Sequence, residues 1–255
     1  MITTYTQEEI QHLREGGKRL ATILVLVRGA VHPGVSTKDL DALAEKLIRE
    51  GGDEPAFLGY IPDGAHYPYP ATLCTSVNDE IVHGIPRADH VLKEGDIIGI
   101  DLGLRHKGFF VDMAMTVPVG TVDEAARVLI DTTKRALDEA ISVVGPEGRV
   151  GDIGNAIGKF VGSRYGIIRE LGGHGVGRHV HEEPYIPNFT QKSPGARFRP
   201  GMVIAIEPML NEGTRGILLD PDGYTFKTAD GKRSAHFEHT ILITEGGHEV
   251  LTALS

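Results

Sequence analysis

The chain has 255 residues, of which 40% are hydrophobic and 24% are charged, enough for one substantial core. Its formal net charge of −9 disfavours sequence-independent binding to nucleic acid, so we expect no direct nucleic-acid partner. The single cysteine, Cys74, fits a reducing compartment. Because no secretory signal opens the chain and no apolar run is long enough to span a bilayer, we expect a cytoplasmic protein without membrane contact.

Two helices are predicted in the first part of the chain. Thr6 and Glu9 form a capping box, after which apolar residues recur at helical spacing. Ser36 with Asp39 begins a second amphipathic helix, and Gly51–Gly52 ends it. The same order of elements is expected again in the second half of the chain. There, a capping box at 121–124 begins a long helix, and a shorter helix follows over about 152–164.

Strands follow the helices in each half and carry carboxylates at matching places. The runs Leu92–Asp101 and Phe198–Glu207 each have a basic residue two before a Gly, then a short apolar strand, then a carboxylate. A second pair of β-rich runs, Phe110–Val117 and Phe237–Ile243, each has a carboxylate at its start. We therefore predict an α+β fold, in which helices cover a mostly antiparallel sheet. One catalytic domain over 1–255 would consist of two pseudo-symmetric halves, about 6–118 and 121–250.

The repeated carboxylates predict a metal site. Asp101 and Glu207 each follow an apolar strand, where a charged group without a partner costs several kcal/mol. Protonation, basic partners such as Arg178 and Arg105, or cations could relieve this cost. Strand-end carboxylates that only bond to backbone are the alternative, but two matched pairs make cations the better explanation. Two divalent ions would neutralise all four carboxylates at once, namely Asp101, Asp112, Glu207 and Glu238.

Histidine completes the expected ligand set. His174 lies in the glycine-rich run Gly172–Gly177, where few side chains block the approach of a metal. Four carboxylates and one imidazole form an oxygen-rich set that favours Mn²⁺, Fe²⁺ or Co²⁺, with Zn²⁺ also able to bind. Two such ions would share a water molecule and make it a nucleophile near neutral pH. We expect the following histidines to be ordinary surface residues: His12, His32, His90, His106, His179 and His248.

These residues together resemble a known family, the type I methionine aminopeptidases, which are metallopeptidases of the pita-bread fold. The resemblance covers about residues 6–250. It is carried by the ligand set and by four segments: His83–Pro86, Gly173–Gly177, His181–Pro184 and Ile206–Pro208.

The resemblance implies a role for each ligand. Asp101 would hold one metal ion, and Asp112 and Glu238 would bridge both ions. His174 and Glu207 would complete the coordination of the second ion. Glu207 is also the expected proton acceptor for the bridging water. The implied reaction is removal of the N-terminal methionine from nascent proteins and peptides.

The resemblance also implies the residues that bind the substrate. His181 would contact the scissile carbonyl oxygen, and His83 would lie near the leaving nitrogen or the second residue, so that a small second residue is preferred. Tyr69, Cys74 and Tyr224 would form the methionine pocket. Tyr224 stands where the family commonly has Trp, and the loop over 61–68 is lengthened. A nucleophilic role for Cys74 is the less favoured alternative, because the activated water already supplies a nucleophile.

The expected partners are the N-termini of nascent polypeptides, with a transient contact to ribosomes, and the expected state is a monomer. Two other functions are compatible with parts of the pattern. X-Pro dipeptidases share the fold and the five ligands but usually carry a large extra N-terminal domain, for which the helix beginning near residue 7 leaves no room. A non-catalytic binding protein of this fold would be expected to lose ligands, whereas all five are present.

Overall fold

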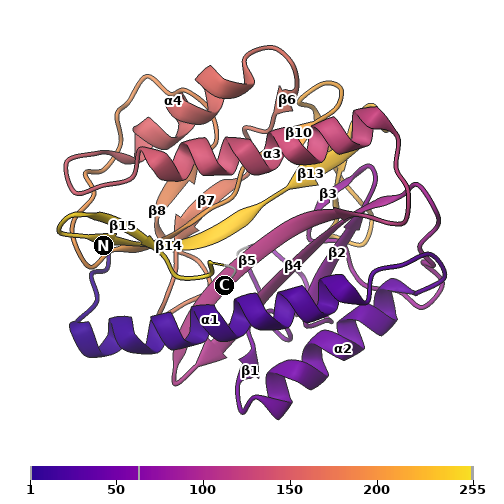
Figure 1. Ribbon diagram of the computed structural model, residues 1–255, viewed down its shortest axis with the longest axis horizontal. Helices are drawn as coiled ribbons and strands as arrows, with labels where there is room; N and C mark the ends of the chain where they lie inside the picture. The colour runs from indigo at the N-terminus through magenta and orange to yellow at the C-terminus, as the bar shows by residue number, and fades with distance from the viewer. Residues whose placement is uncertain (1, 63, 254–255) are drawn as a thin grey trace.

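A computed structural model of the chain describes residues 2–62 and 64–253 (Figure 1). In Figure 1, α1 and α3 lie across the front of the strands, with α2 packed beside α1 and α4 beside α3. The helices have these bounds: α1 (Gln7–Gly29), α2 (Thr37–Glu50), α3 (Glu124–Ser142) and α4 (Val150–Val161). Within the described residues, none of these helices has the length and apolar character that crossing a membrane requires.

The main sheet joins nine strands, and every pair in it is antiparallel. Its path runs β1, β4, β5, β14, β9, β7, β8, while β2 pairs with β4 and β15 with β14. The bounds are β1 (Glu54–Pro55), β2 (Leu73–Val77), β4 (Ile97–His106), β5 (Phe109–Pro118), β7 (Gly172–Gly175), β8 (Glu182–Pro187), β9 (Val203–Ile206), β14 (Glu238–Thr244) and β15 (Gly247–Val250). The strand β14, late in the sequence, therefore joins the two halves of the chain.

Two small sheets of three strands flank the main one, in the orders β13, β10, β6 and β11, β12, β3. Their bounds are β3 (Glu80–Val82), β6 (Gly166–Ile167), β10 (Met209–Asn211), β11 (Ile217–Leu219), β12 (Phe226–Thr228) and β13 (Ser234–His236).

The predicted helix starts are confirmed in the first half and wrong for α3. The helix α1 begins with the expected capping box of Thr6 and Glu9, and α2 begins after Ser36 as expected, where Ser36 and Asp39 also form a capping box. In α3 the N-cap is Asp123, whose Oδ1 accepts from the Ala126 N–H at 2.7 Å, and no box forms at Thr121. Aspartate is as good an N-cap as threonine, so the local sequence offers two starts two residues apart.

Two apolar clusters lie between the helices and the main sheet. The first packs α1 and α2 against β4 and β5, and the second packs α3 and α4 against β9 and β14. Leu20 and Leu24 in the first cluster and Ile153 and Ile157 in the second are fully buried. Each such side chain stabilises the fold by about 1.5–3 kcal/mol. The clusters therefore fix both helix pairs against the sheet.

Matching contacts in the two halves support our proposal of one catalytic domain made of two related halves. The residue before each second helix makes an isolated antiparallel bridge, Ser36 to Val91 in the first half and Arg149 to Arg197 in the second. The third residue of each helix, Asp39 or Asp152, bonds back to the N–H of that same bridging residue. The helix and the strand that follows it are thus tied together in the same way twice.

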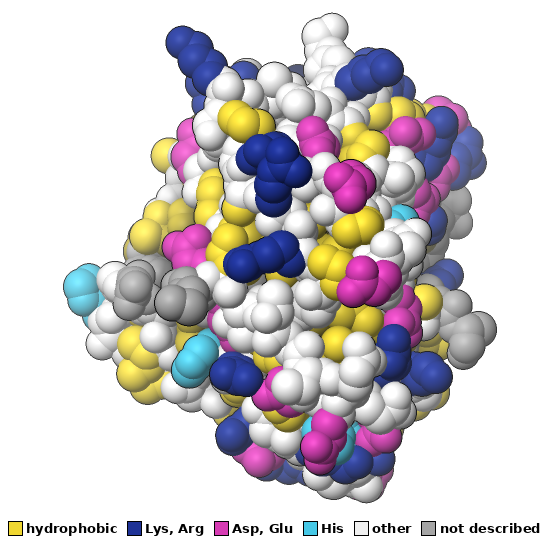
Figure 2. All heavy atoms as spheres, turned by 90° about the vertical axis from the view of Figure 1, so that its left-hand side faces the viewer, with side chains coloured by type: hydrophobic (Ala, Val, Ile, Leu, Met, Phe, Trp, Pro, Cys, Tyr) yellow, Lys and Arg dark blue, Asp and Glu magenta, His cyan; other side chains and the backbone are white. Residues whose placement is uncertain are grey.

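Charges of both signs are mixed on the side of the molecule shown in Figure 2. Lys and Arg side chains alternate there with Asp and Glu, and apolar side chains lie between them. This face therefore presents no single-signed patch of the kind that follows a phosphate backbone.

Candidate metal centre

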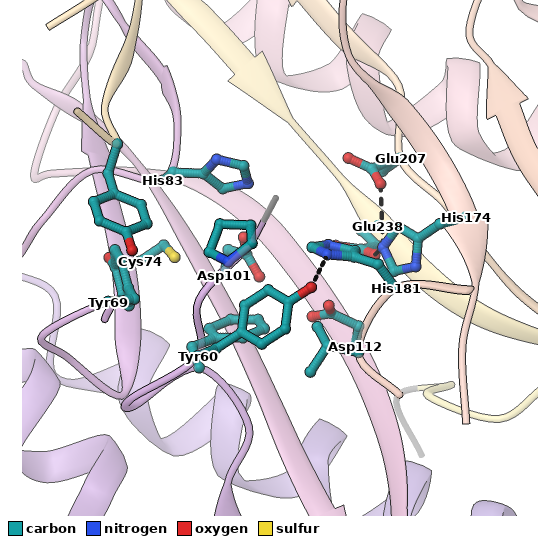
Figure 3. A pocket seen from close by; sticks show the side chains of 14 residues that line it. Tyr60, Tyr69, Cys74, His83, Asp101, Asp112, His174, His181, Glu207 and Glu238 are labelled. Carbon is teal, nitrogen blue, oxygen red and sulfur yellow. Dashed lines mark hydrogen bonds and ion pairs between the residues drawn. The ribbon is translucent and has the colours of Figure 1, made fainter. Parts of the chain in front are cut away.

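Five neighbouring strands of the main sheet carry the five predicted ligands. In the order β4, β5, β14, β9, β7 they bring Asp101, Asp112, Glu238, Glu207 and His174 to one place (Figure 3). Glu207 directly follows β9, as predicted, whereas Asp101 lies in the middle of β4 rather than at its end. The reason is that the hairpin of β4 and β5 continues past the site to His106. The side chains form the floor of one cavity.

The ligand atoms are close enough to share cations. Donor atoms of Asp112, His174 and Glu238 all lie within 4.8 Å of one another. The His174 Nε2 atom is 3.5 Å from Glu207 Oε1 and 4.0 Å from Glu238 Oε1. Asp101 lines the same cavity and lies beside Asp112. The sequence prediction that these five side chains converge therefore matches the geometry.

Burial makes the cluster costly without cations. Removal from water, reinforced by the neighbouring carboxylates, holds the pKa values of Asp101, Glu207 and Glu238 well above the usual range. Burial also raises the pKa of Asp112 to about 7 and lowers the pKa of His174 to about 3, so the imidazole supplies no compensating charge. Among the described residues, Asp101 Oδ1 and Glu238 Oε1 are buried oxygens without a hydrogen-bond partner.

The basic residues considered as partners of these carboxylates lie elsewhere. Arg178 pairs with Glu9 at 2.7 Å, and Arg105 pairs with Glu54 at 3.4 Å. That possibility is therefore wrong, because both arginines find carboxylates near the surface. Orphaned buried oxygens in an oxygen-rich set with one imidazole fit two divalent cations.

His174 is oriented for metal binding by its own backbone. Its Nδ1 lies 2.9 Å from the Gly175 carbonyl oxygen, to which the protonated Nδ1 donates. This bond leaves the lone pair of Nε2 directed at the two glutamates, which is the usual arrangement for a histidine ligand. A Cβ at Gly173 would lie 2.3 Å from the Ala205 carbonyl oxygen, so the neighbouring position requires glycine.

The raised pKa of Asp112 predicts how stability of the metal-free protein depends on pH. The unfolded chain releases this proton near 3.8, whereas the folded chain keeps it up to about 7. Stability is therefore lost as pH rises through that range, because the folded state must then carry the buried charge. One pKa unit corresponds to about 1.4 kcal/mol, so the cost near pH 8 is of the order of several kcal/mol.

Replacing Asp112 by Asn is expected to raise the unfolding temperature of the metal-stripped protein near pH 8. The amide carries no charge, and its oxygen can still accept from the Met113 N–H, now 2.9 Å from Asp112 Oδ1. Calorimetry in chelator should show the gain shrinking as pH falls from 7 toward 4 and vanishing below 3.8, where Asp112 is protonated in the folded and the unfolded chain alike. An equal gain at both pH values would contradict the expectation. Added Mn²⁺ should reverse the order of the two proteins.

His181 and His83 line the same cavity as the ligand cluster (Figure 3). The His181 ring centre is 4.4 Å from that of His174, and its Nδ1 is 2.9 Å from the Tyr60 hydroxyl. His83 has φ of 60°, a conformation that residues other than glycine adopt rarely and mostly at functional sites. Burial lowers the pKa of His83 to about 4, so it is a neutral donor or acceptor near neutral pH.

Aromatic residues and sulfur form the apolar wall of the cavity. Tyr69, Cys74 and Tyr224 all line it and are buried, together with Phe57 and Val180. The rings of Tyr69 and Tyr224 are 5.1 Å apart in an edge-to-face arrangement. Burial raises the pKa of the Cys74 thiol, which makes a thiolate nucleophile unfavourable there and supports a pocket role.

The lengthened loop is fastened to the opposite side of the cavity mouth. The Tyr224 hydroxyl donates to the Tyr67 carbonyl oxygen, and the Tyr67 hydroxyl donates to the Asp222 carbonyl oxygen. The two rings also pack edge to face with centres 5.1 Å apart. Tyr67 therefore ties its part of the loop to the segment that carries Tyr224.

Sequence reasoning missed two residues of the site and misplaced one histidine. Tyr60 lies in a loop without periodic pattern, so nothing marked it in advance. His236 comes two residues before Glu238, and strand alternation could have placed it on the same face. His106, expected at the surface, is buried, with Nδ1 at 2.6 Å from Asp53 Oδ1. The unexpected length of β4 carries it beneath α1.

The fold and the buried ligand cluster define a metal-dependent hydrolase, and comparison with known proteins agrees. Residues 11–245 match metallopeptidase family M24. The chain is 47% identical over 259 residues to a methionine aminopeptidase of Aquifex aeolicus, covering 99% of each chain. It matches the crystal structure of a methionine aminopeptidase from Thermotoga maritima with a TM-score of 0.94 and 42% identity, covering 100% of both chains.

The chain therefore belongs to metallopeptidase family M24. Its full-length relatives in that family are methionine aminopeptidases, which confirms the resemblance and the predicted pita-bread fold. A prolidase from Pyrococcus horikoshii has the same fold, with a TM-score of 0.75 and 20% identity, over 99% of this chain and 64% of its own. That likeness concerns the fold alone.

Proposed function

We propose that this chain removes the N-terminal methionine from nascent proteins and peptides. The observation that carries the proposal is the cavity itself. It is lined by five candidate metal ligands, carried in or directly after five adjacent strands, and by aromatic rings and a thiol. Methionine is flexible and polarizable, so such a wall suits its side chain. The full-length likeness to methionine aminopeptidases supports the same activity.

Two divalent ions, Mn²⁺, Fe²⁺ or Co²⁺ with Zn²⁺ as a further candidate, complete the proposed site. When bound, they lower the pKa of a shared water so that it becomes a nucleophile near neutral pH. Asp101 would hold one ion, and Asp112 and Glu238 would bridge both. His174 and Glu207 would complete the coordination of the second ion. Glu207 would also accept the proton of the attacking water.

The substrate would be held by residues above the ligand floor. The His181 Nε2–H would donate to the scissile carbonyl oxygen and stabilise the negative charge that develops there. Its Nδ1, beside the Tyr60 hydroxyl, keeps the ring in the required orientation. The free α-amine of the substrate would meet the carboxylates, which explains cleavage at the N-terminus only. His83 would contact the leaving nitrogen or the second residue.

A small second residue in the substrate is part of the proposal. His83 has a left-handed backbone, and its ring packs against that of Phe226 with centres 5.9 Å apart, so its side chain occupies this side of the cavity. Substrates with Gly, Ala or Ser at the second position should therefore be cleaved faster than those with a long side chain. The proposed setting is the cytoplasm, where a monomer would meet emerging N-termini in transient contact with ribosomes.

The test is release of free methionine by metal-stripped protein refilled with Mn²⁺ or Fe²⁺. Met-Ala-Ser should be cleaved only with metal, and Met-Lys-Ser should be cleaved more slowly. Equal rates for the two would contradict the second-residue preference. Cleavage of an X-Pro peptide but of neither methionine peptide would indicate a prolidase activity instead. A protein that binds no metal and cleaves neither peptide would favour a binding function.

A further inference from the structure

His236 approaches the ligand cluster but is not among the described residues that line the substrate cavity. It ends β13, and its backbone is held by Thr116, whose Oγ1 accepts from the His236 N–H at 2.9 Å and donates to its carbonyl oxygen at 3.0 Å. Glu238 follows two residues later, at the start of β14, and its Oε2 atom lies 3.9 Å from the His236 Nε2 atom. Two fixed backbone bonds therefore aim the imidazole at the metal centre.

The ring of His236 is buried, and its Nε2 has no hydrogen-bond partner among the described residues. This atom lies 3.9 Å from Glu207 Oε2 and 3.9 Å from Glu238 Oε2. The same glutamates turn their Oε1 atoms toward His174 Nε2, at 3.5 and 4.0 Å. The two carboxylates thus lie between two imidazoles. A buried polar atom left without a partner at such a place requires an explanation.

We propose that His236 is a positioning residue of the metal centre, whose Nε2–H donates to the outer oxygens of Glu207 and Glu238. The inference rests on the proposed function, because it assumes that these glutamates hold metal. Each distance is about 1 Å longer than an N–H···O hydrogen bond, so a small rotation of either carboxylate closes it. Groups that bond to ligand carboxylates in this way orient them and raise metal affinity.

This role differs from those of the five ligands. A donor at Oε2 keeps the Oε1 atom of each glutamate turned toward His174, where the two oxygens and the imidazole nitrogen face one another. Without the donor, either carboxylate could rotate about its last torsion, which is soft. The expected consequence is weaker metal binding, with little change in the apolar wall of the cavity, which His236 does not line.

The test compares Mn²⁺ binding by the metal-stripped wild type, His236→Gln and His236→Leu, measured by titration calorimetry. Glutamine keeps an N–H donor but has no imidazole, whereas leucine fills the space and donates nothing. We expect His236→Leu to bind Mn²⁺ about 10- to 100-fold more weakly and His236→Gln to bind it nearly as tightly as wild type. His236→Met is a second replacement without a donor, should leucine disturb packing.

His239→Leu is the matched control. His239 lies on the opposite face of β14, where its Nδ1 is 2.9 Å from Thr252 Oγ1, so its loss should leave Mn²⁺ affinity unchanged. If His236→Gln binds as weakly as His236→Leu, the ring is a ligand and the proposal is overturned. If His236→Leu binds like wild type, the ring only fills space and the proposal is again overturned. Tight Mn²⁺ binding by wild type without methionine release would instead contradict the proposed function alone.

Discussion

Replacing Glu207 by Gln should lower kcat/KM for Met-Ala-Ser by about 10³-fold or more. Two losses combine in this variant. The neutral amide is a poor metal ligand, and it cannot accept a proton from the attacking water, a role that alone contributes about 10²–10⁴-fold. Glu207 lies directly after β9, and its Oε1 is 3.5 Å from His174 Nε2. This position suits both proposed roles, metal ligand and proton acceptor. Steady-state kinetics and elemental analysis together measure both losses.

Glu170→Gln is the control for that variant. Glu170 is exposed and faces Arg215 at 3.5 Å, so its charge can be removed without replacing any of the five candidate ligands. Its kinetics should equal those of wild type. If Glu207→Gln kept activity within tenfold of wild type, Glu207 would be neither the ligand nor the proton acceptor. The folded state should survive, because the substitution removes a buried charge.

Replacing His181 by Ala should lower kcat by about 10²–10³-fold while the protein keeps its metal. This range is typical for the loss of one donor to a developing oxyanion. The reason is the position of the ring, which lines the cavity without belonging to the carboxylate cluster. Its Nδ1 is held by the Tyr60 hydroxyl. Saturating substrate isolates kcat, and metal content is measured on the same sample.

His179→Ala tests whether the loop rather than the ring is responsible. His179 is exposed two residues earlier in the same loop, and only its backbone contributes, with its N–H donating to Glu182 Oε1 at 2.9 Å. This variant should be as active as wild type. A similar loss in both variants would point to disturbance of the loop. Loss of metal from His181→Ala would make His181 a ligand and overturn its proposed contact with substrate.

The parts of the fold that sequence could predict are those decided by short segments. The starts of α1 after Thr6 and of α2 after Ser36 are decided within four residues, and they appear as expected. The repeat of carboxylates after apolar runs also predicted that these four side chains converge, because charge next to a buried strand is hard to explain otherwise. The capping error at Thr121 shows the limit, since two acceptable N-caps lay close together.

The remaining features depend on contacts between distant segments. The mid-strand place of Asp101 follows from how far β4 pairs with β5, and no local signal sets that length. Tyr60 reaches His181 across 121 positions of sequence, so only the folded chain brings them together. The prediction that His106 lies at the surface was wrong for the same reason. Glu15 of α1, which is 91 residues earlier in the sequence, contacts its ring.

The place of β14 in the sheet has a consequence for the order of assembly. This strand pairs with β5 on one side and β9 on the other, yet it begins only at Glu238. Until it is synthesised, β5 lacks its inner neighbour and presents an open edge, a feature that invites pairing with other chains. Closure of the sheet depends on contacts between segments far apart in sequence, which slows folding. The protein should therefore acquire its native sheet only after synthesis has passed β14, and truncation before that strand should yield aggregation rather than a smaller folded unit.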